Sequence, residues 1–469
     1  MRKNKKSTVL IRQKSYNSVL LLLNSILQGK KYPDIIISEL FKTEDFSSDE
    51  KAVIVDLVYG ILRHLGRLDH IIGHASRATI TNLDPEILNS FRICTYQALF
   101  TNVSAAGIVN NAVALSSNYT KLSGFVKRTI EAVIKNKDLV IFPDPEKASI
   151  EYICAYHSHP RWIVEKWLTE SGSVKEVEAI CRADNMQPPL TIRVNPLKSD
   201  IGSLQKALDE EGYSSLMTEL SPSGLIVDKK EDIFKTRAFR EGLFEVQDEG
   251  SQLVTLLTGA KPGELVIDAC AGNGGKSLFL SGLMKNRGTI IASDLSAAKL
   301  TNLRHRAGKA GAFNIKTMSR EALNEYNNMA DCVFIDAPCS SMGVFRRNPD
   351  SKWRLTPDDV NELAVKQKEI LSEYSRLVKP GGRLVYATCT ISKEENEDNV
   401  RGFLAGNRDF YLVPISEIHD FKSGKLTCDD GFFRSLPHVH NTDGFFGAVM
   451  MKKSDSNNAF SCGVKKWIA

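Results

Sequence analysis

The feature that most constrains the fold is a regular alternation of strand-like and helix-like segments from about residue 243 onward. Short runs rich in β-branched residues predict strands at 265–268, 289–293, 314–318, 332–336, 383–388 and 445–450. Apolar positions at helical spacing predict helices between them, including 277–283, 297–310 and 357–377. This alternation is typical of a parallel, doubly wound α/β sheet, in which ligands bind at the carboxyl ends of the strands.

Two other patterns precede this region. Residues from about 8 to 140 have apolar positions at helical spacing, which predicts an all-α domain, and the prolines in Phe142-Pro143-Asp144-Pro145 indicate its boundary. Strand-like runs at 190–194 and 224–227, with a helical stretch at 201–211, predict a small α+β module. We therefore expect a helical domain at 8–143, an α+β module at 146–242 and an α/β domain at 243–453.

Charge and cysteine usage narrow the class of protein. The net charge is only +5, but the first 31 residues carry eight basic and no acidic side chains, which suits contact with a phosphate backbone. These eight are Arg2, Lys3, Lys5, Lys6, Arg12, Lys14, Lys30 and Lys31. Nine cysteines without a CxxC pair or a secretory signal predict neither a disulfide framework nor a zinc site. No stretch approaches the ~20 apolar residues of a membrane span, so a cytoplasmic location is expected.

The first strand of the α/β region leads into a glycine-rich turn and a helix, a combination that cradles nucleotides and nucleosides. The turn does not complete a phosphate P-loop, because Cys270 occupies the leading glycine position. It does not complete a dinucleotide fingerprint either, because Ser277 occupies the third glycine position. Asp294 follows the second strand, where an acid can accept hydrogen bonds from both ribose hydroxyls. Together these features favour a nucleoside ligand.

Two cysteines, Cys339 and Cys389, follow predicted strands and should both lie on the ligand edge of the sheet. A thiolate at such an edge suits methylation of cytosine at C5, where sulfur adds to C6 and makes C5 nucleophilic. Asp336 can protonate or hydrogen-bond the ring at N3, and the base must leave its stack to reach these groups. The spacing alone does not decide which cysteine attacks.

The segments 268–277, 336–341 and 388–389 resemble the RNA (cytosine-5) methyltransferases of the Nol/Nop/Sun family. The resemblance covers nearly the whole chain, and further matching stretches are 246–252, 346–350, 352–353, 394–397 and 443–446. The N-terminal region resembles a NusB-like domain. The combination is similar to the bacterial members that methylate small-subunit (16S) rRNA.

The resemblance implies an S-adenosylmethionine-dependent enzyme that methylates RNA. It implies that Cys389 is the nucleophile and that Cys339 helps to release the product. Asp336, because of its expected contact with the ring, is the third predicted catalytic residue. The cofactor site would be lined by Cys270, Ala271, Gly272, Asn273, Gly274, Gly275, Lys276, Asp294 and Asp336. Two positions depart from the family pattern: Asn273 replaces a proline, and Ser319-Arg320 replaces the usual acid near the adenine.

Other charged positions have competing interpretations. Arg346, Arg347 and Lys352, beside Trp353, favour RNA contact over a solvated loop. Residues 392–395, Ser-Lys-Glu-Glu, fit a helix capping box, and His438 and His440 fit surface histidines without a metal. The alternative functions are a tRNA methyltransferase of the same family and a non-catalytic RNA-binding factor in ribosome assembly.

Overall fold

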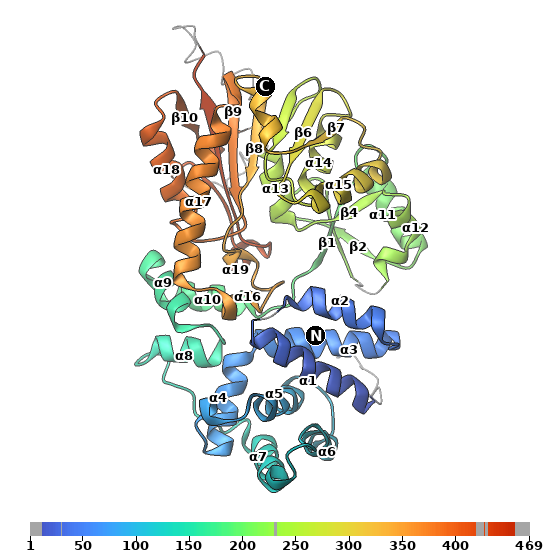
Figure 1. Ribbon diagram of the computed structural model, residues 1–469, viewed down its shortest axis with the longest axis vertical. Helices are drawn as coiled ribbons and strands as arrows, with labels where there is room; N and C mark the ends of the chain where they lie inside the picture. The colour runs from blue at the N-terminus through green and yellow to red at the C-terminus, as the bar shows by residue number, and fades with distance from the viewer. Residues whose placement is uncertain (1–11, 30, 229–231, 419–425, 427–429, 455–469) are drawn as a thin grey trace. The chain divides into compact units, whose positions relative to one another are not determined.

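A computed structural model of the protein describes residues 12–29, 31–228, 232–418, 426 and 430–454. The chain divides into two compact units (Figure 1). The helical unit comprises Met1–Met186 and Phe345–Arg354, and the sheet unit comprises Gln187–Val344 and Leu355–Ala469. Five members of the basic N-terminal arm lie outside the described residues: Arg2, Lys3, Lys5, Lys6 and Lys30. The other three pair with acids, Arg12 with Glu50, Lys14 with Glu44 and Lys31 with Glu39.

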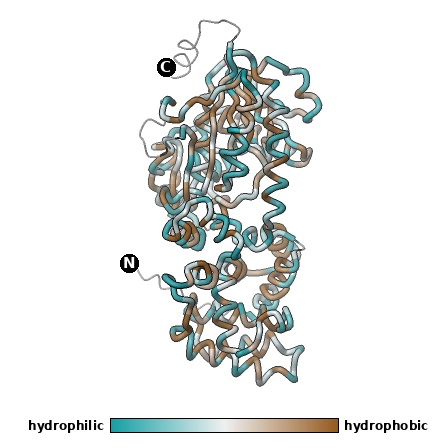
Figure 2. The backbone as a smooth tube through the Cα atoms, turned by 90° about the vertical axis from the view of Figure 1, so that its left-hand side faces the viewer, coloured by the Kyte–Doolittle hydropathy of each residue, from teal (hydrophilic) through white to brown (hydrophobic). Residues whose placement is uncertain are grey.

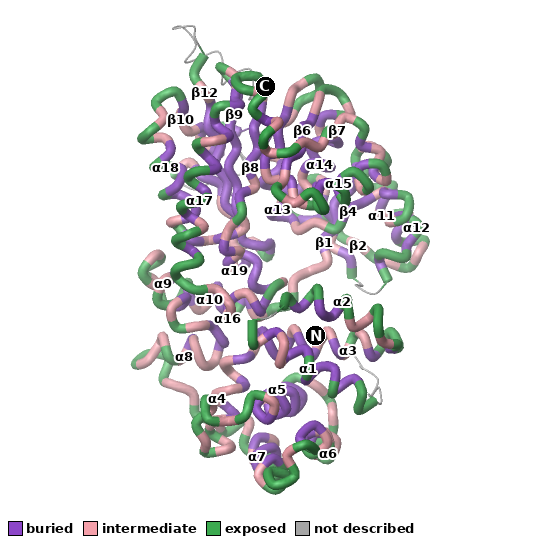
Figure 3. Tube along the Cα trace, viewed as in Figure 1, coloured by how far each residue is buried: buried purple, intermediate pink, exposed green. Residues whose placement is uncertain are grey.

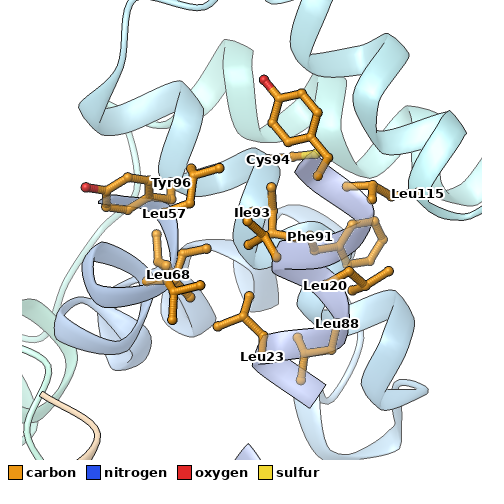
Figure 4. Close-up of a cluster of buried hydrophobic side chains, with 14 of the residues drawn as sticks. Leu20, Leu23, Leu57, Leu68, Leu88, Phe91, Ile93, Cys94, Tyr96 and Leu115 are labelled. Atoms are coloured by element: carbon orange, nitrogen blue, oxygen red, sulfur yellow. The ribbon is translucent and has the colours of Figure 1, made fainter. Parts of the chain in front are cut away.

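The helical unit confirms the predicted all-α region. Its longer helices are α1 (Gln13–Leu27), α2 (Pro33–Thr43), α3 (Ser48–Arg63), α4 (Leu65–Ser76), α5 (Pro85–Phe100), α6 (Ala105–Leu115), α7 (Ser123–Asn136), α8 (Ser149–Tyr156), α9 (Arg161–Ser171) and α10 (Val174–Asp184). Helix α5 is buried along most of its length, and Figure 4 shows its side chains among leucines from α1, α3, α4 and α6. Helix α3 begins with a capping box between Ser47 and Glu50, which satisfies two free N–H groups.

The segment Phe345–Arg354, which includes the short helix α16 (Ser351–Arg354), packs into the helical unit at the C-terminal end of α3. The last turn of a helix leaves carbonyl groups without intrahelical partners. Lys352 Nζ donates to Arg63 O at 3.0 Å, and Trp353 Nε1 donates to Leu62 O at 2.7 Å. These two side chains therefore satisfy the carbonyls at the end of α3.

This packing overturns the predicted RNA contact of two residues in the segment. Arg346 and Lys352 are only 2% and 1% exposed, so their cationic groups do not face solvent. The carbonyl of Arg346 accepts a hydrogen bond from Arg63 Nη2 at 2.9 Å. The prediction failed because the contacts of these two residues with Arg63 join positions almost 300 residues apart in the sequence.

We expect Lys352→Ala to lower the free energy of unfolding by about 3 kcal/mol, because it leaves buried polar groups without their cation. Burial lowers the pKa of Lys352, and the nearby carboxyl of Asp184 is 1% exposed. Calorimetry of the full chain measures the change. Lys127→Ala, at an exposed lysine on α7, should change stability by no more than about 0.5 kcal/mol. Unchanged stability combined with weakened RNA binding would support the original RNA-contact interpretation.

The sheet unit begins with an α+β region that corresponds to the C-terminal part of the predicted module, whereas residues 146–186 belong to the helical unit. Its elements are β1 (Leu190–Val194), α11 (Ile201–Glu210), β2 (Ser215–Met217), β3 (Gly224–Val227), α12 (Arg237–Arg240) and β4 (Phe244–Val246). The strands form an antiparallel sheet in the order β2-β3-β1-β4. Strands β2 and β4 were not predicted, because three residues are too few to display an alternating pattern.

The second sheet has the order β10-β12-β9-β8-β5-β6-β7, with β11 paired to β12. Its strands are β5 (Leu265–Asp268), β6 (Thr289–Ser293), β7 (Ile315–Met318), β8 (Ala330–Asp336), β9 (Val378–Thr388), β10 (Phe410–Val413), β11 (Phe433–Ser435) and β12 (Phe445–Lys452). Strands β5 to β9 are parallel, as predicted. The prediction of a wholly parallel sheet was wrong at one edge, where β12 runs antiparallel to β9. Strand β11 also pairs antiparallel with β12, and only the short helix α19 (Pro437–His440) lies between these two strands, whereas a parallel connection needs a longer crossover.

Helices cover both faces of this sheet, and successive residues of each strand face opposite sides. Val333 and Ile335 pack with α17 (Pro357–Ser375) and α18 (Glu397–Gly406) on one face. Cys332 and Phe334 pack with α13 (Glu249–Leu256) and α14 (Gly275–Leu283) on the other. Helix α15 (Ala297–Ala310) packs beside α14. Figure 3 shows β8 and β9 buried, and Figure 2 shows apolar stretches alternating with hydrophilic ones along the chain.

The strand order reverses between β5 and β8. From β5 the chain adds β6 and β7 on one side, and it then returns to add β8 and β9 on the other. Such a reversal opens a crevice at the carboxyl ends of the strands. Among the described residues, no helix combines the length and the apolar character needed to cross a membrane.

Candidate active site

The predicted site residues gather around the crevice at the carboxyl ends of β5, β6, β8 and β9. A cavity of about 630 Å³ is lined by Cys270, Gly272, Asp294, Asp336, Cys339 and Cys389, among others. A neighbouring cavity of about 270 Å³ is lined by Ala271, Asn273, Gly275 and Lys276, among others. Gly274 lines neither cavity, but it shapes the turn between them.

The glycine-rich turn needs glycine for two physical reasons. Gly272 and Gly274 have φ angles of +55° and +83°, a conformation that L side chains rarely adopt. A Cβ atom on Gly274 would also lie 2.4 Å from Cγ of Leu303 on α15. Helix α14 begins directly at Gly275, so the free N–H groups of its first turn lie at the turn. The turn therefore fits the close approach of a nucleoside-containing cofactor.

Asp294, which follows β6, forms hydrogen bonds with the glycine-rich turn at residues 269–274, called the cofactor turn below. Its Oδ2 accepts a hydrogen bond from Gly272 N at 2.9 Å, and its Oδ1 accepts one from Ser296 N at 2.8 Å. A carboxylate has further lone pairs for the two hydroxyls of a ribose. At Asn273, which replaces the proline of the family pattern, the backbone carbonyl accepts a hydrogen bond from Arg306 Nη1 at 2.6 Å.

Arg193 of β1 supports the same turn and was missed from the sequence. Its guanidinium is 1% exposed, and Nη1 donates to Gly275 O at 2.9 Å. An arginine inside a strand-like run carries no sequence signal of a partner 82 residues away. Arg320 belongs to the pair Ser319-Arg320 that replaces the usual acid of the family pattern. It lines the larger cavity and forms an ion pair with Glu373 of α17.

Asp268, at the end of β5, is a buried acid beneath the cofactor turn. It is 1% exposed, and its Oδ2 accepts a hydrogen bond from Ser277 Oγ at 2.6 Å. Burial raises the pKa of Asp268 to about 7 and outweighs the hydroxyl, which lowers it. The folded protein therefore favours the protonated form at mildly acidic pH.

We expect Asp268→Asn to stabilise the protein more at pH 8 than at pH 5. Because the pKa of Asp268 is raised in the folded state, the wild type loses stability as pH rises from about 4 through 7. The gain of the variant over the wild type should grow by roughly 2–3 kcal/mol between these pH values. Urea unfolding at both pH values measures it, with the exposed Asp409→Asn as control. A gain that is independent of pH would contradict a raised pKa.

The side chain of Lys276 forms an ion pair with Asp336. Its Nζ lies 2.6 Å from Asp336 Oδ2, and both side chains line the smaller cavity. Burial lowers the pKa of Lys276, but the carboxylate of Asp336 outweighs it and the net shift is upward. The ammonium–carboxylate pair therefore forms a polar wall beside the cysteines.

The two cysteines meet at the ends of β8 and β9. Sγ of Cys339 lies 3.3 Å from Sγ of Cys389, a hydrogen-bonding distance that is far longer than a disulfide bond. The hydrogen bond to Cys389 and burial raise the pKa of Cys339, whereas the bond from Cys339 lowers the pKa of Cys389. The pair therefore favours a thiolate on Cys389 and a thiol on Cys339. All cysteines in the described part of the chain are free.

One interpretation of the region after Cys389 needs correction. Glu395 is not part of a helix capping box, because α18 begins at Glu397 and Glu395 is fully buried against the loop that follows β8. His438 and His440 are partly exposed, and His440 Nδ1 accepts a hydrogen bond from Leu436 N at 2.9 Å. No group of potential metal ligands occurs among the described residues.

Three family patterns match successive regions of the chain. The pattern of the 16S rRNA methyltransferase RsmB/F family matches residues 254–451. A ferredoxin-like domain found in RsmF/B-like methyltransferases matches residues 159–234, and the NusB family matches residues 18–135. The three matches correspond to the α/β, α+β and all-α regions, respectively.

Curated relatives match along most of their length. A probable ribosomal RNA small subunit methyltransferase B of Bacillus subtilis is 30% identical over 433 residues, which cover 91% of this chain and 96% of the relative. The ribosomal RNA small subunit methyltransferase B of an Escherichia coli strain is 27% identical, covering 87% and 92%.

Solved structures agree with this picture. The crystal structure titled PH0851 superposes with a TM-score of 0.76 at 31% identity, covering 95% of this chain and all of that chain. NSun6 from Pyrococcus horikoshii, solved with SFG, superposes with a TM-score of 0.55 at 22% identity, covering 63% of this chain and 99% of that chain. The second likeness concerns the fold alone.

Proposed function

The chain belongs to the RsmB/F family of 16S rRNA methyltransferases, and on that premise we propose that it methylates C5 of a cytosine in small-subunit rRNA through a covalent cysteine adduct. The methyl donor is S-adenosylmethionine, as in the family. The observation that carries the proposal is the pair of sulfurs 3.3 Å apart beside Asp336, at the carboxyl ends of adjacent parallel strands. The domain boundaries that go with it are 8–143, 146–242 and 243–453.

In the proposed reaction, Cys389 attacks as a thiolate and its sulfur forms a bond to C6 of the cytosine. The electrons of the 5,6 double bond move into the ring, and C5 becomes nucleophilic. After C5 takes the methyl group, a base removes the C5 proton. The C5–H electrons re-form the double bond, and the C6–S bond breaks to return the Cys389 thiolate. Cys339, in hydrogen-bonding contact with Cys389, assists this release.

Asp336 and Lys276 act on the ring while Cys389 attacks. In its protonated form, the carboxyl group of Asp336, which lines the cavity, donates a hydrogen bond to N3 of the base and stabilises the negative charge that develops on the ring. The ammonium of Lys276, 2.6 Å away, holds this carboxyl in place and is itself a proton donor. The base must be flipped from its stack to reach the crevice.

The cofactor turn and Asp294 fit S-adenosylmethionine, which supplies an electrophilic methyl group when bound. Gly272, Gly274 and the start of α14 allow close backbone approach, and Asp294 accepts the ribose hydroxyls. Asp336 lines the same cavity between the cofactor turn and the cysteines. The residues of the chain therefore orient donor and base toward each other.

We expect Asp294→Ala to weaken binding of S-adenosylmethionine by about 10- to 100-fold, because two ribose hydrogen bonds to a charged group are lost. The variant also loses the bond to Gly272 N, which orders the turn. Isothermal titration calorimetry measures the affinity, and Asp209→Ala, at an exposed acid on α11, serves as control. Equal affinities of Asp294→Ala and wild type would remove Asp294 from the cofactor site.

The proposal is tested by methylating purified 16S rRNA, small subunits and tRNA in separate reactions. Bisulfite sequencing reports the position of any new 5-methylcytosine. We expect one modified cytosine in 16S rRNA and none in tRNA. Methylation of tRNA alone would favour the tRNA enzyme, and binding of RNA without methyl transfer would favour an assembly factor. The NusB match supports the rRNA substrate.

A further inference from the structure

Glu395 is a buried carboxylate that the proposed reaction does not use. Its side chain is fully buried, and burial of a charge is costly unless hydrogen bonds compensate. Four hydrogen bonds converge on it from three segments of the sheet unit. Ser340 donates through its backbone N at 2.8 Å and through its hydroxyl, Gln367 Nε2 donates at 2.9 Å, and Thr390 Oγ1 donates at 3.2 Å.

Hydrogen bonds of this network hold both sequence neighbours of Cys339. Ser340 directly follows Cys339, and its backbone N–H is fixed by Glu395. Pro338 directly precedes Cys339, and its carbonyl accepts from Gln367 Nε2 at 2.8 Å. Gln367 is in turn oriented by Asn399 Nδ2, which donates to its Oε1 at 2.9 Å. The backbone around Cys339 is therefore held by Glu395 and by its partner on α17.

The next residue, Asn396, forms hydrogen bonds with both sequence neighbours of Cys389. Thr388 directly precedes Cys389, and its hydroxyl donates to Asn396 Oδ1 at 2.6 Å. Thr390 directly follows Cys389, and its carbonyl accepts from Asn396 Nδ2 at 3.0 Å. Asn396 is 2% exposed. Two consecutive residues thus hold the backbone on either side of the two reactive sulfurs.

We propose that Glu395 positions Cys339 for product release and that Asn396 positions Cys389 for attack, so that adjacent residues control separate steps of one reaction. The inference rests on the proposed function. Neither side chain lines either of the two cavities, so both act through the cysteines.

The charge of Glu395 adds to its geometric role. The pKa of Cys339 is raised first by its hydrogen bond to Cys389, then by burial, and also by the carboxylate of Glu395. A protonated Cys339 donates to the Cys389 sulfur and leaves the negative charge there. The carboxylate therefore holds Cys339 both in the position and in the protonation state that complement Cys389.

The test compares Glu395→Ala and Asn396→Ala in the full-length protein with 16S rRNA as substrate. We expect Glu395→Ala to lower the steady-state rate on the order of 100-fold while a denaturant-resistant protein–RNA complex accumulates. We expect Asn396→Ala to lower the rate of the first turnover by a similar factor, with less covalent complex than in the wild type. Asp398→Ala, at an exposed acid on α18, should behave as the wild type in both measurements.

Two milder variants keep the test valid if an alanine variant does not fold. Glu395→Gln retains acceptors for Ser340 N and Gln367, and the two hydroxyls can rotate to accept from its amide, so it should restore most of the rate. Ser340→Ala removes one hydroxyl and should accumulate a smaller amount of covalent complex than Glu395→Ala.

Equal loss of rate in Glu395→Ala and Asn396→Ala, in proportion to a lowered melting temperature and without a difference in covalent complex, would overturn the assignment to separate steps. Failure of the proposed function has a different signature, because Cys389→Ala would then retain methyl transfer.

Discussion

Cys389→Ala should abolish methyl transfer, whereas Cys339→Ala should trap a covalent protein–RNA complex. In the proposed reaction the Cys389 sulfur makes C5 nucleophilic, so we expect its loss to lower the rate at least ~1000-fold, equivalent to about 4 kcal/mol of barrier. In Cys339→Ala the attacking thiolate is intact, but the group 3.3 Å from its sulfur that assists release is gone. The adduct therefore forms and persists.

Denaturing gels of enzyme mixed with labelled 16S rRNA and S-adenosylmethionine report the covalent complex. A tritiated methyl group reports transfer in the same reactions. Cys332→Ala is the matched control, since this cysteine lies on the same strand as the site but is fully buried and faces α13 and α14. A gel-shifted complex in Cys389→Ala, and none in Cys339→Ala, would reverse the two roles.

Asp336→Asn should lower kcat by about 100- to 10,000-fold, the range that positioned acid–base groups contribute. The substitution keeps the shape of the side chain but removes the carboxylate that lies 2.6 Å from the Lys276 ammonium. The neutral amide cannot support proton transfer to the ring. Because the change affects the reacting base, the larger effect should be on kcat rather than on cofactor affinity.

Single-turnover kinetics and calorimetric binding of S-adenosylmethionine separate these effects. Asp331→Asn is a suitable control, because this residue lies near the opposite end of β8 and bonds Leu265 N. It should retain the chemical step even if stability falls. If Asp336→Asn weakens cofactor binding and leaves kcat unchanged, Asp336 acts only in the cofactor site.

The local sequence pattern was sufficient to predict a strand where a short apolar run has clear ends. Strands β5 and β6 agree with their predicted bounds, because a short apolar run is followed in each case by a polar turn. The direction of β12 could not be predicted in this way, since an apolar run looks the same in a parallel and an antiparallel pair. Strand β4 has only three residues and carries too little pattern to be recognised.

The same reasoning explains which site residues were predicted. Residues that follow strands, such as Asp294, Cys339 and Cys389, can be located because parallel strands end at one edge. The roles of Lys352 and Glu395 depend on partners that are distant in sequence, Arg63 and Ser340 respectively. A charged residue that is buried by distant partners has no signature in its own neighbourhood. Lys352 was therefore assigned to RNA contact, and Glu395 was assigned to a helix capping box.

The segment Phe345–Arg354 also determines how the chain can be divided experimentally. Because it belongs to the helical unit but is encoded inside the sheet unit, no single cut separates the two. A fragment that begins at Gln187 carries the fully buried Phe345 and Lys352 without the Leu62 and Arg63 carbonyls that this segment caps. A soluble catalytic fragment therefore requires a short linker in place of these ten residues. Exchange of the helical unit between homologues must likewise transplant two separate stretches of the gene.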